Sequence, residues 1–128
     1  MQGKTVLVVD DDTSSLELID FILKLKHYKA ELSSIPEDTV NTAVRLKPDL
    51  IILDLLMPTM SGIEVCTRLK QDDRTRDIPV LFISAMVSER DMEAGVRAGA
   101  VGYIIKPYDT SQVLAKIDQI MSKMETLK

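Results

Sequence analysis

Acidic side chains directly follow two separate apolar runs of this sequence. Asp10, Asp11 and Asp12 come after the first run, and Asp54 comes after another one near the middle of the chain. Carboxylates that meet in one cleft repel one another, which raises some of their pKa values unless a cation neutralises them. Mg²⁺ binds oxygen ligands and commonly uses one or two carboxylates with waters and phosphate oxygens. If the fold brings them together, these acids predict a Mg²⁺ site.

Two further apolar runs end in groups of complementary chemistry. Ser84 ends one run, and Lys106, followed by Pro107, ends the other. A lysine and a hydroxyl that face carboxylates supply a cation and a donor for an incoming anion. Acids, metal, lysine and hydroxyl together are typical of phosphoryl transfer, where positioning and charge neutralisation do most of the catalysis.

Each of these groups also has a plain structural interpretation when it is taken alone. An acidic triplet after a strand suits a solvated loop, and Lys-Pro suits a turn. Ser84 could cap a helix that contains Glu89, and Asp54 could cap the loop beyond it. The functional interpretation depends on all four strand ends lying side by side.

The apolar runs themselves predict the scaffold. Continuous, β-branched runs of this length suit strands buried on both faces, as in a parallel sheet. The sequence between them has helical periodicity, and Thr13, Ser14 and Ser15 are N-cap candidates for the first helix. Pro36 lies near the first turn of the second helix. We expect strands at residues 6–9, 28–32, 50–53, 80–83 and 101–105, and helices whose apolar faces are Leu16/Ile19/Ile22/Leu23, Val40/Ala43/Val44, Ile63/Cys66/Leu69, Met92/Val96 and Val113/Ile117/Ile120/Met121/Met124.

Five strands that alternate with five helices predict an α/β fold with helices on both faces of a parallel sheet. The commonest small arrangement is the flavodoxin-like (βα)5 three-layer sandwich, with the strand order 2-1-3-4-5. Ligands of such sheets bind at the carboxyl ends of the strands, near the switch point between the first and third strands. The acids after those two strands would therefore face each other.

Length and charge exclude several classes of protein. A chain of 128 residues suits a single domain, 1–128, and its net charge of −4 argues against a nucleic-acid-binding surface. Cys66 is the only cysteine, so no internal disulfide can form. No apolar stretch approaches the roughly 18 residues of a membrane span. We expect a cytoplasmic protein that binds neither membranes nor nucleic acid directly.

Four motifs, in this order and spacing, carry a family resemblance: Val8-Val-Asp-Asp11, Asp54-Leu-Leu-Met-Pro58 with Gly62 beyond it, Ser84-Ala85, and Gly102-Tyr-Ile-Ile-Lys-Pro107. Through them the sequence resembles the CheY-like receiver domains of response regulators, over essentially its whole length. The resemblance implies that Asp54 is the phosphoacceptor of a two-component signalling system. It also implies a Mg²⁺ cofactor held by Asp10, Asp11, Asp54 and the backbone carbonyl of Leu56.

The resemblance also assigns roles to the other strand ends. Lys106 would pair with the phosphoryl group, and the Lys106–Pro107 peptide bond would be cis. Ser84 and Tyr103 would be the switch residues that shift the surface of helix 4, strand 5 and helix 5. The plain alternative for Tyr103 is a half-buried edge aromatic with a hydrated hydroxyl. His27, the only histidine, is expected at the surface or at the end of the first helix.

The implied partners follow from this function. A histidine kinase or a histidine phosphotransfer protein would donate the phosphoryl group, and an effector protein or an attached output domain would respond to it. The protein would be a monomer or a phosphorylation-dependent homodimer, and it would catalyse only its own phosphorylation and dephosphorylation. Leu56 and Met86 are apolar at positions that, by the resemblance, influence how easily water attacks the acyl phosphate, which predicts a long-lived phosphorylated state.

Three other interpretations compete with this one. A haloacid-dehalogenase-like phosphatase also places acids after its first strand, but Thr13 comes one position early for that motif. A flavodoxin-like electron carrier would need a hydroxyl- and glycine-rich phosphate loop where Asp10, Asp11 and Asp12 stand. A degenerate receiver would act only as a protein-binding module. The presence of all four residues Asp11, Asp54, Ser84 and Lys106 argues against it. Whether the chain acts alone or belongs to a longer regulator stays open.

Overall fold

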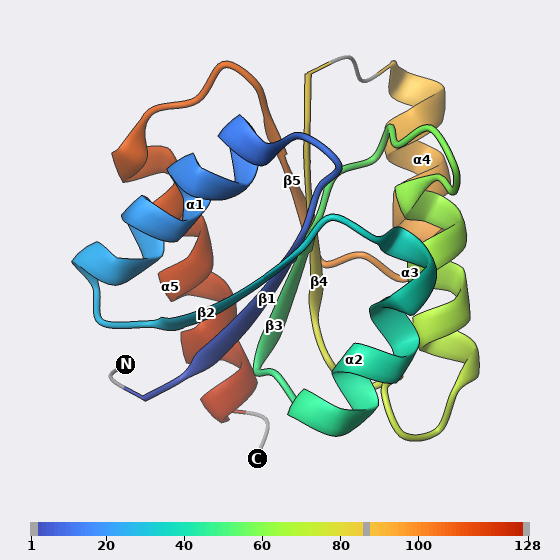
Figure 1. Cartoon of the computed structure of the whole chain (residues 1–128), viewed down its shortest axis with the longest axis horizontal. Helices are drawn as coiled ribbons and strands as arrows, with labels where there is room; N and C mark the ends of the chain where they lie inside the picture. The colour runs from blue at the N-terminus through green and yellow to red at the C-terminus, as the bar shows by residue number, and fades with distance from the viewer. Residues whose placement is uncertain (1–2, 86–87, 127–128) are drawn as a thin grey trace.

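A parallel five-stranded sheet of order β2-β1-β3-β4-β5 forms the centre of the structure. The computed structural model describes residues 3–85 and 88–126. Helices α1 and α5 cover one face of the sheet, and α2, α3 and α4 cover the other (Figure 1). This is the predicted flavodoxin-like three-layer sandwich. Its elements are β1 (Thr5–Val9), α1 (Thr13–Leu25), β2 (Lys29–Ser33), the 3-10 helix η1 (Pro36–Asp38), α2 (Thr39–Leu46), β3 (Leu50–Leu53), α3 (Gly62–Gln71), β4 (Val80–Ser84), α4 (Glu89–Ala98), β5 (Gly102–Ile105) and α5 (Thr110–Thr126).

The central strand β1 contributes to two separate cores because successive side chains of a strand point to opposite faces. Val6 and Val8 pack with the apolar residues of α1 and α5. Leu7 and Val9 pack on the other face, with residues of α3. All four are at most 2% exposed, and burial of such a side chain contributes roughly 1.5–3 kcal/mol. Two-sided burial is the physical reason that this strand reads as a continuous apolar run.

The capping of α1 differs from the sequence expectation. Thr13, Ser14 and Ser15 were N-cap candidates, but the N-cap is Asp12, whose carboxylate accepts the Ser14 N–H. Asp12 has the extended backbone of an N-cap, whereas the three hydroxyl residues already lie within the helix. Pro36 likewise opens the separate 3-10 helix η1 just before α2.

The apolar face predicted for α4 is wrong at one of its two residues. Val96 is 63% exposed, and the buried residue of this helix is Gly95. A Cβ atom at Gly95 would overlap the hydroxyl of Tyr103 on β5. The helix therefore approaches β5 through its glycine, and Val96 turns towards solvent.

Within residues 3–85 and 88–126, every helix is too short or too polar to cross a membrane.

Candidate functional site

The carboxyl ends of β1 and β3 bring three acids together at the upper edge of the sheet in Figure 1. The strands pair in parallel with Val9 opposite Leu53, and the Asp54 N–H donates to the Val9 carbonyl at 3.0 Å. The residues that follow the two strands are therefore neighbours. Carboxylate oxygens of Asp10, Asp11 and Asp54 lie within 4.8 Å of one another.

Asp10 is the most buried of the three acids, with 6% of its surface exposed. Burial raises its pKa to about 6, and the Asp54 charge adds to this effect, while the Asp12 N–H and Lys106 oppose it. Neighbouring ligands of an octahedral Mg²⁺ lie roughly 3.0 Å apart, and opposite ones roughly 4.2 Å, at a Mg–O distance of about 2.1 Å. Oxygens that lie within 4.8 Å of one another can reach this spacing by small rotations of their side chains. The three acids offer only oxygen ligands, which suit a hard dication such as Mg²⁺. A dication would also stabilise the charged form of the buried Asp10 carboxylate.

The loop that carries Asp54 is fixed by the start of α3. One Asp54 oxygen accepts the Leu56 N–H at 3.2 Å, and the Gly62 N–H donates to the Leu55 carbonyl at 2.8 Å. A Cβ atom at Gly62 would overlap the Asp54 carbonyl oxygen. Ser61 caps α3 by accepting the Glu64 N–H. The glycine of the sequence motif thus allows the helix to rest directly on the backbone of the phosphoacceptor candidate.

Lys106 reaches the acids from the end of β5. Its Nζ atom lies 3.4 Å from an oxygen of Asp10 and donates to the Ser15 hydroxyl at 3.0 Å. The Lys106–Pro107 peptide bond is cis, as predicted. The sequence does not indicate Ser15 as part of this cluster, because its position before the first helix predicts only a helix cap.

Ser84 ends β4 with a hydroxyl that is buried and has no hydrogen-bond partner among the described residues. It does not cap α4, since that N-cap is Ser88, which exchanges two hydrogen bonds with Asp91. Met86, expected to flank the site, lies outside the described residues. The structure therefore leaves Ser84 as an uncommitted donor at the same edge as the acids.

Tyr103 lies on β5 with its ring half-buried against α4. Its hydroxyl donates to the carbonyl oxygens of Asp91 and Met92 at 2.8 and 3.0 Å. The ring centroid is 5.5 Å from that of Phe82, and burial raises the pKa of the Tyr103 hydroxyl. This side chain therefore connects the edge strand to the first half of α4.

The other residues considered from the sequence lie at the margin of the site or away from it. The Leu56 side chain is 53% exposed. Asp12 faces the first turn of α1, as its cap. His27 follows the far end of that helix with a positive φ of 61°, at the opposite edge of the sheet. His27 is therefore not part of the acidic site.

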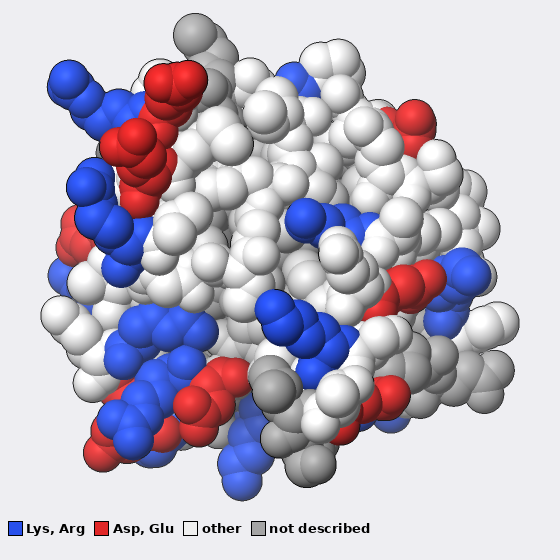
Figure 2. Space-filling model, turned by 180° about the vertical axis from the view of Figure 1, so that it is seen from behind, with Lys and Arg blue, Asp and Glu red and all other residues white. Residues whose placement is uncertain are grey.

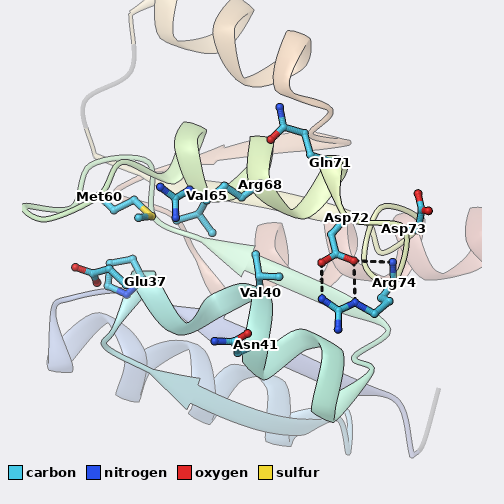
Figure 3. A pocket seen from close by; sticks show the side chains of 11 residues that line it. Glu37, Val40, Asn41, Met60, Val65, Arg68, Gln71, Asp72, Asp73 and Arg74 are labelled. Carbon is cyan, nitrogen blue, oxygen red and sulfur yellow. Dashed lines mark hydrogen bonds and ion pairs between the residues drawn. The ribbon is translucent and has the colours of Figure 1, made fainter.

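A groove of about 780 Å³ lies between α2 and α3, and none of the site residues above lines it (Figure 3). Asp72 accepts two hydrogen bonds from the Arg74 guanidinium there, at 2.7 and 3.0 Å. These bonds lower the Asp72 pKa to about 2. Acidic and basic side chains both line the groove, so its chemistry selects no class of ligand. Its lining is Pro36, Glu37, Val40, Asn41, Met60, Val65, Arg68, Gln71, Asp72, Asp73 and Arg74.

Comparison with known proteins identifies the family. Residues 6–118 match the response regulator receiver domain, and the chain belongs to this family. It is thus a receiver domain of the two-component signalling systems. A phosphatase of the haloacid-dehalogenase type and a flavodoxin-like electron carrier are thereby excluded.

Two curated relatives illustrate the similarity. The chain is 34% identical over 122 residues to the DNA-binding dual master transcriptional regulator RpaA of Synechocystis, covering 95% of this chain and 51% of RpaA. It is 35% identical over 123 residues to the phosphate regulon transcriptional regulatory protein PhoB of Pseudomonas aeruginosa, covering 96% and 54%. The chain spans about half the length of these relatives.

Solved structures agree with the fold. The chemotaxis protein CheY4 of Vibrio cholerae superposes with a TM-score of 0.86 at 25% identity, covering 91% of this chain and 98% of that one. The signal receiver domain of a signal transduction histidine kinase from Syntrophus aciditrophicus gives a TM-score of 0.86 at 29% identity, covering 94% and 92%.

Proposed function

We propose that this receiver domain is a phosphorylation-activated switch of a two-component or phosphorelay system, with Asp54 as its phosphoacceptor. The observation that carries the proposal is the cluster at one sheet edge. There the oxygens of Asp10, Asp11 and Asp54 lie within 4.8 Å of one another, and the Lys106 ammonium pairs with Asp10. Such a cluster can accept an anionic group only with its negative charge compensated.

In the proposed reaction, a carboxylate oxygen of Asp54 attacks the phosphorus of a phosphohistidine on a histidine kinase or a histidine phosphotransfer protein. The P–N bond breaks, the imidazole keeps the electron pair, and an acyl phosphate forms on Asp54. The Lys106 ammonium neutralises a phosphoryl oxygen. Asp10, Asp11, Asp54 and the Leu56 carbonyl would hold Mg²⁺, which supplies further charge neutralisation when bound. The domain catalyses only its own phosphorylation and dephosphorylation.

The switch proposed for this domain uses Ser84 and Tyr103. Ser84 has a buried hydroxyl that can donate to a phosphoryl oxygen, and Tyr103 holds α4 through two carbonyl oxygens. Movement of Ser84 would let the Tyr103 ring turn inward, which releases α4. A ligand shifts such an equilibrium by its differential affinity for the two states, typically about 1–3 kcal/mol.

The proposed output surface is the face formed by α4, β5 and α5. Figure 2 looks onto this face, with α4 on the left and α5 on the right, and a broad uncharged area lies between them. Val96, Val101 and Ile105 expose 63%, 49% and 49% of their surfaces there. An effector protein, an attached output domain or a second phosphorylated copy would bind this face. We take residues 1–128 as one receiver domain, which would act in the cytoplasm and would not contact nucleic acid directly.

The decisive experiment is incubation with acetyl phosphate, with and without Mg²⁺, followed by measurement of intact mass. We expect a Mg²⁺-dependent adduct of one phosphoryl group in the wild type and none in Asp54→Asn. An adduct that persists in the variant would show that Asp54 is not the phosphoacceptor, and Asp10 would be the next residue to test. Absence of any adduct would leave a binding module that works without phosphorylation.

Dephosphorylation should be slow if apolar groups obstruct the attacking water. Leu56 follows the phosphoacceptor by two positions, and Met86 follows Ser84 by two. We expect Leu56→Asn and Met86→Glu each to accelerate loss of the phosphoryl group, because each replaces an apolar side chain by one that binds water. Release of inorganic phosphate from the purified phosphoprotein measures this rate. Unchanged or slower release would refute the idea.

A further inference from the structure

The ammonium group of Lys106 is held on the α1 side of the acidic edge. Its Nζ atom donates to an oxygen of Asp10 at 3.4 Å and to the Ser15 hydroxyl at 3.0 Å. Among the described residues its only ion pair is the one with Asp10, so Asp54 is not its partner. The shorter of its two contacts is therefore to a hydroxyl of α1 and not to the phosphoacceptor.

Ser15 is itself oriented by Asp12. The Ser15 hydroxyl donates to one Asp12 oxygen at 2.9 Å, and the other Asp12 oxygen accepts the Ser14 N–H at 3.2 Å. With its single proton engaged by the carboxylate, the Ser15 oxygen presents lone pairs to Lys106. Hydrogen bonds in such a chain polarise one another, so the negative charge of Asp12 strengthens the contact to the ammonium group.

We propose that Asp12 and Ser15 form a resting anchor for Lys106, which competes with a phosphoryl group on Asp54 for the ammonium. The proposal rests on the phosphoacceptor function argued above. Lysine carries its charge on a flexible four-carbon stem. Movement of Nζ towards Asp54 would stretch the 3.0 Å contact with Ser15 beyond hydrogen-bonding distance. Ser15 is thus a positioning residue that acts through Lys106, and Asp12, the third acid, acts through Ser15.

The test is binding of beryllofluoride, an analogue of the phosphoryl group, to the Mg²⁺-loaded protein by calorimetry. We expect Ser15→Ala to bind it about fivefold more tightly, which is the equilibrium equivalent of one typical hydrogen bond. Ser15→Thr keeps the hydroxyl and should match the wild type. Asp12→Asn keeps a good N-cap but removes the charge, and should give a smaller gain of about twofold.

The controls separate an anchor from a general effect on folding. Ser14→Ala removes a neighbouring hydroxyl that makes no hydrogen bond among the described residues, and it should leave beryllofluoride binding unchanged. The affinity for Mg²⁺ alone should be equal in Ser15→Ala and the wild type. In a Lys106→Ala background the gain from Ser15→Ala should vanish, because the two residues would act through one contact.

The outcomes are distinguishable. Unchanged or weaker beryllofluoride binding by Ser15→Ala, or a gain that persists without Lys106, would overturn the anchor and leave the phosphoacceptor function intact. Failure of the wild type to bind beryllofluoride with Mg²⁺ would instead overturn the proposed function and the anchor with it.

Discussion

Gly62 leaves no room for a side chain at the start of α3. A Cβ atom there would overlap the Asp54 carbonyl oxygen and lie 2.9 Å from the Cα atom of Leu55. Both neighbours are backbone atoms just beyond β3, which cannot move aside as the end of a flexible side chain can. We expect Gly62→Ala to lower the free energy of unfolding by about 1–3 kcal/mol, as overpacking typically does. Urea unfolding measures this change.

A matched glycine provides the control for this prediction. A Cβ atom at Gly102 would come within 2.8 Å of Lys116, but only of the Cε atom near the end of that side chain. The lysine can move aside, so Gly102→Ala should cost clearly less than Gly62→Ala. Equal costs would mean that close approach to the Asp54 backbone does not explain the glycine.

Residues that end buried strands could be predicted from the sequence, and contacts between distant side chains could not. Asp10, Asp54 and Ser84 each end an apolar run, and the parallel sheet places such ends at one edge. Ser15 lies inside a helix, and its contact with Lys106 joins residues 91 positions apart. Nothing in the local sequence of either residue indicates that contact.

Helix α4 depends on one tyrosine for part of its attachment to the sheet. The Tyr103 hydroxyl donates to the carbonyl oxygens of Asp91 and Met92. We expect Tyr103→Phe to speed backbone amide hydrogen exchange in α4 by about fivefold, because a typical hydrogen bond contributes about 1 kcal/mol to local stability. Exchange followed by NMR, residue by residue, measures the effect.

Exchange in α1, on the other face of the sheet, should stay unchanged in that variant. Equal acceleration in both helices would indicate a global loss of stability. Unchanged exchange in α4 would show that the hydroxyl contacts do not hold the helix.

At the scale of elements, the sequence predicted type and order well and helix faces less well. The run 50–53 is observed unchanged as β3, because a strand buried on both faces is apolar throughout. The face of α4 was wrong at Val96, since the partner of this helix is an aromatic ring that fits only against Gly95. A periodic pattern of apolar residues cannot show where a glycine serves as the contact.

One hydrogen bond ties the first half of the chain to its last helix. The Tyr28 hydroxyl, just before β2, donates to an Asp118 oxygen of α5 at 2.9 Å. We expect Tyr28→Phe to lower the free energy of unfolding by about 1 kcal/mol, the typical contribution of such a bond. Urea unfolding at neutral pH measures it. Tyr108→Phe is the control, because the Tyr108 hydroxyl makes no hydrogen bond within residues 3–85 and 88–126.

The contribution of Tyr28 should also depend on pH. Burial, and then the hydrogen bond to Asp118, raise the pKa of Tyr28 above its ordinary value. In the unfolded chain the phenol ionises near pH 10. The stabilisation is therefore fully present below about pH 10 and is lost as the pH rises further. The difference in stability between wild type and Tyr28→Phe should shrink between about pH 10 and 11, and a constant difference would contradict this assignment.

If the chain folds while it is synthesised on a ribosome, the strand order also decides when each part of the site can form. β1 pairs with β2 and β3, so the first three strands can form a sheet before β4 and β5 are made. At that stage Asp10, Asp11 and Asp54 would already meet, whereas Lys106 would still be missing. Repulsion among the acids then disfavours the nascent half-domain. A dication from the surrounding medium, or Lys106 once it is synthesised, would relieve this repulsion. The charges that suit signalling would then also influence when the chain folds.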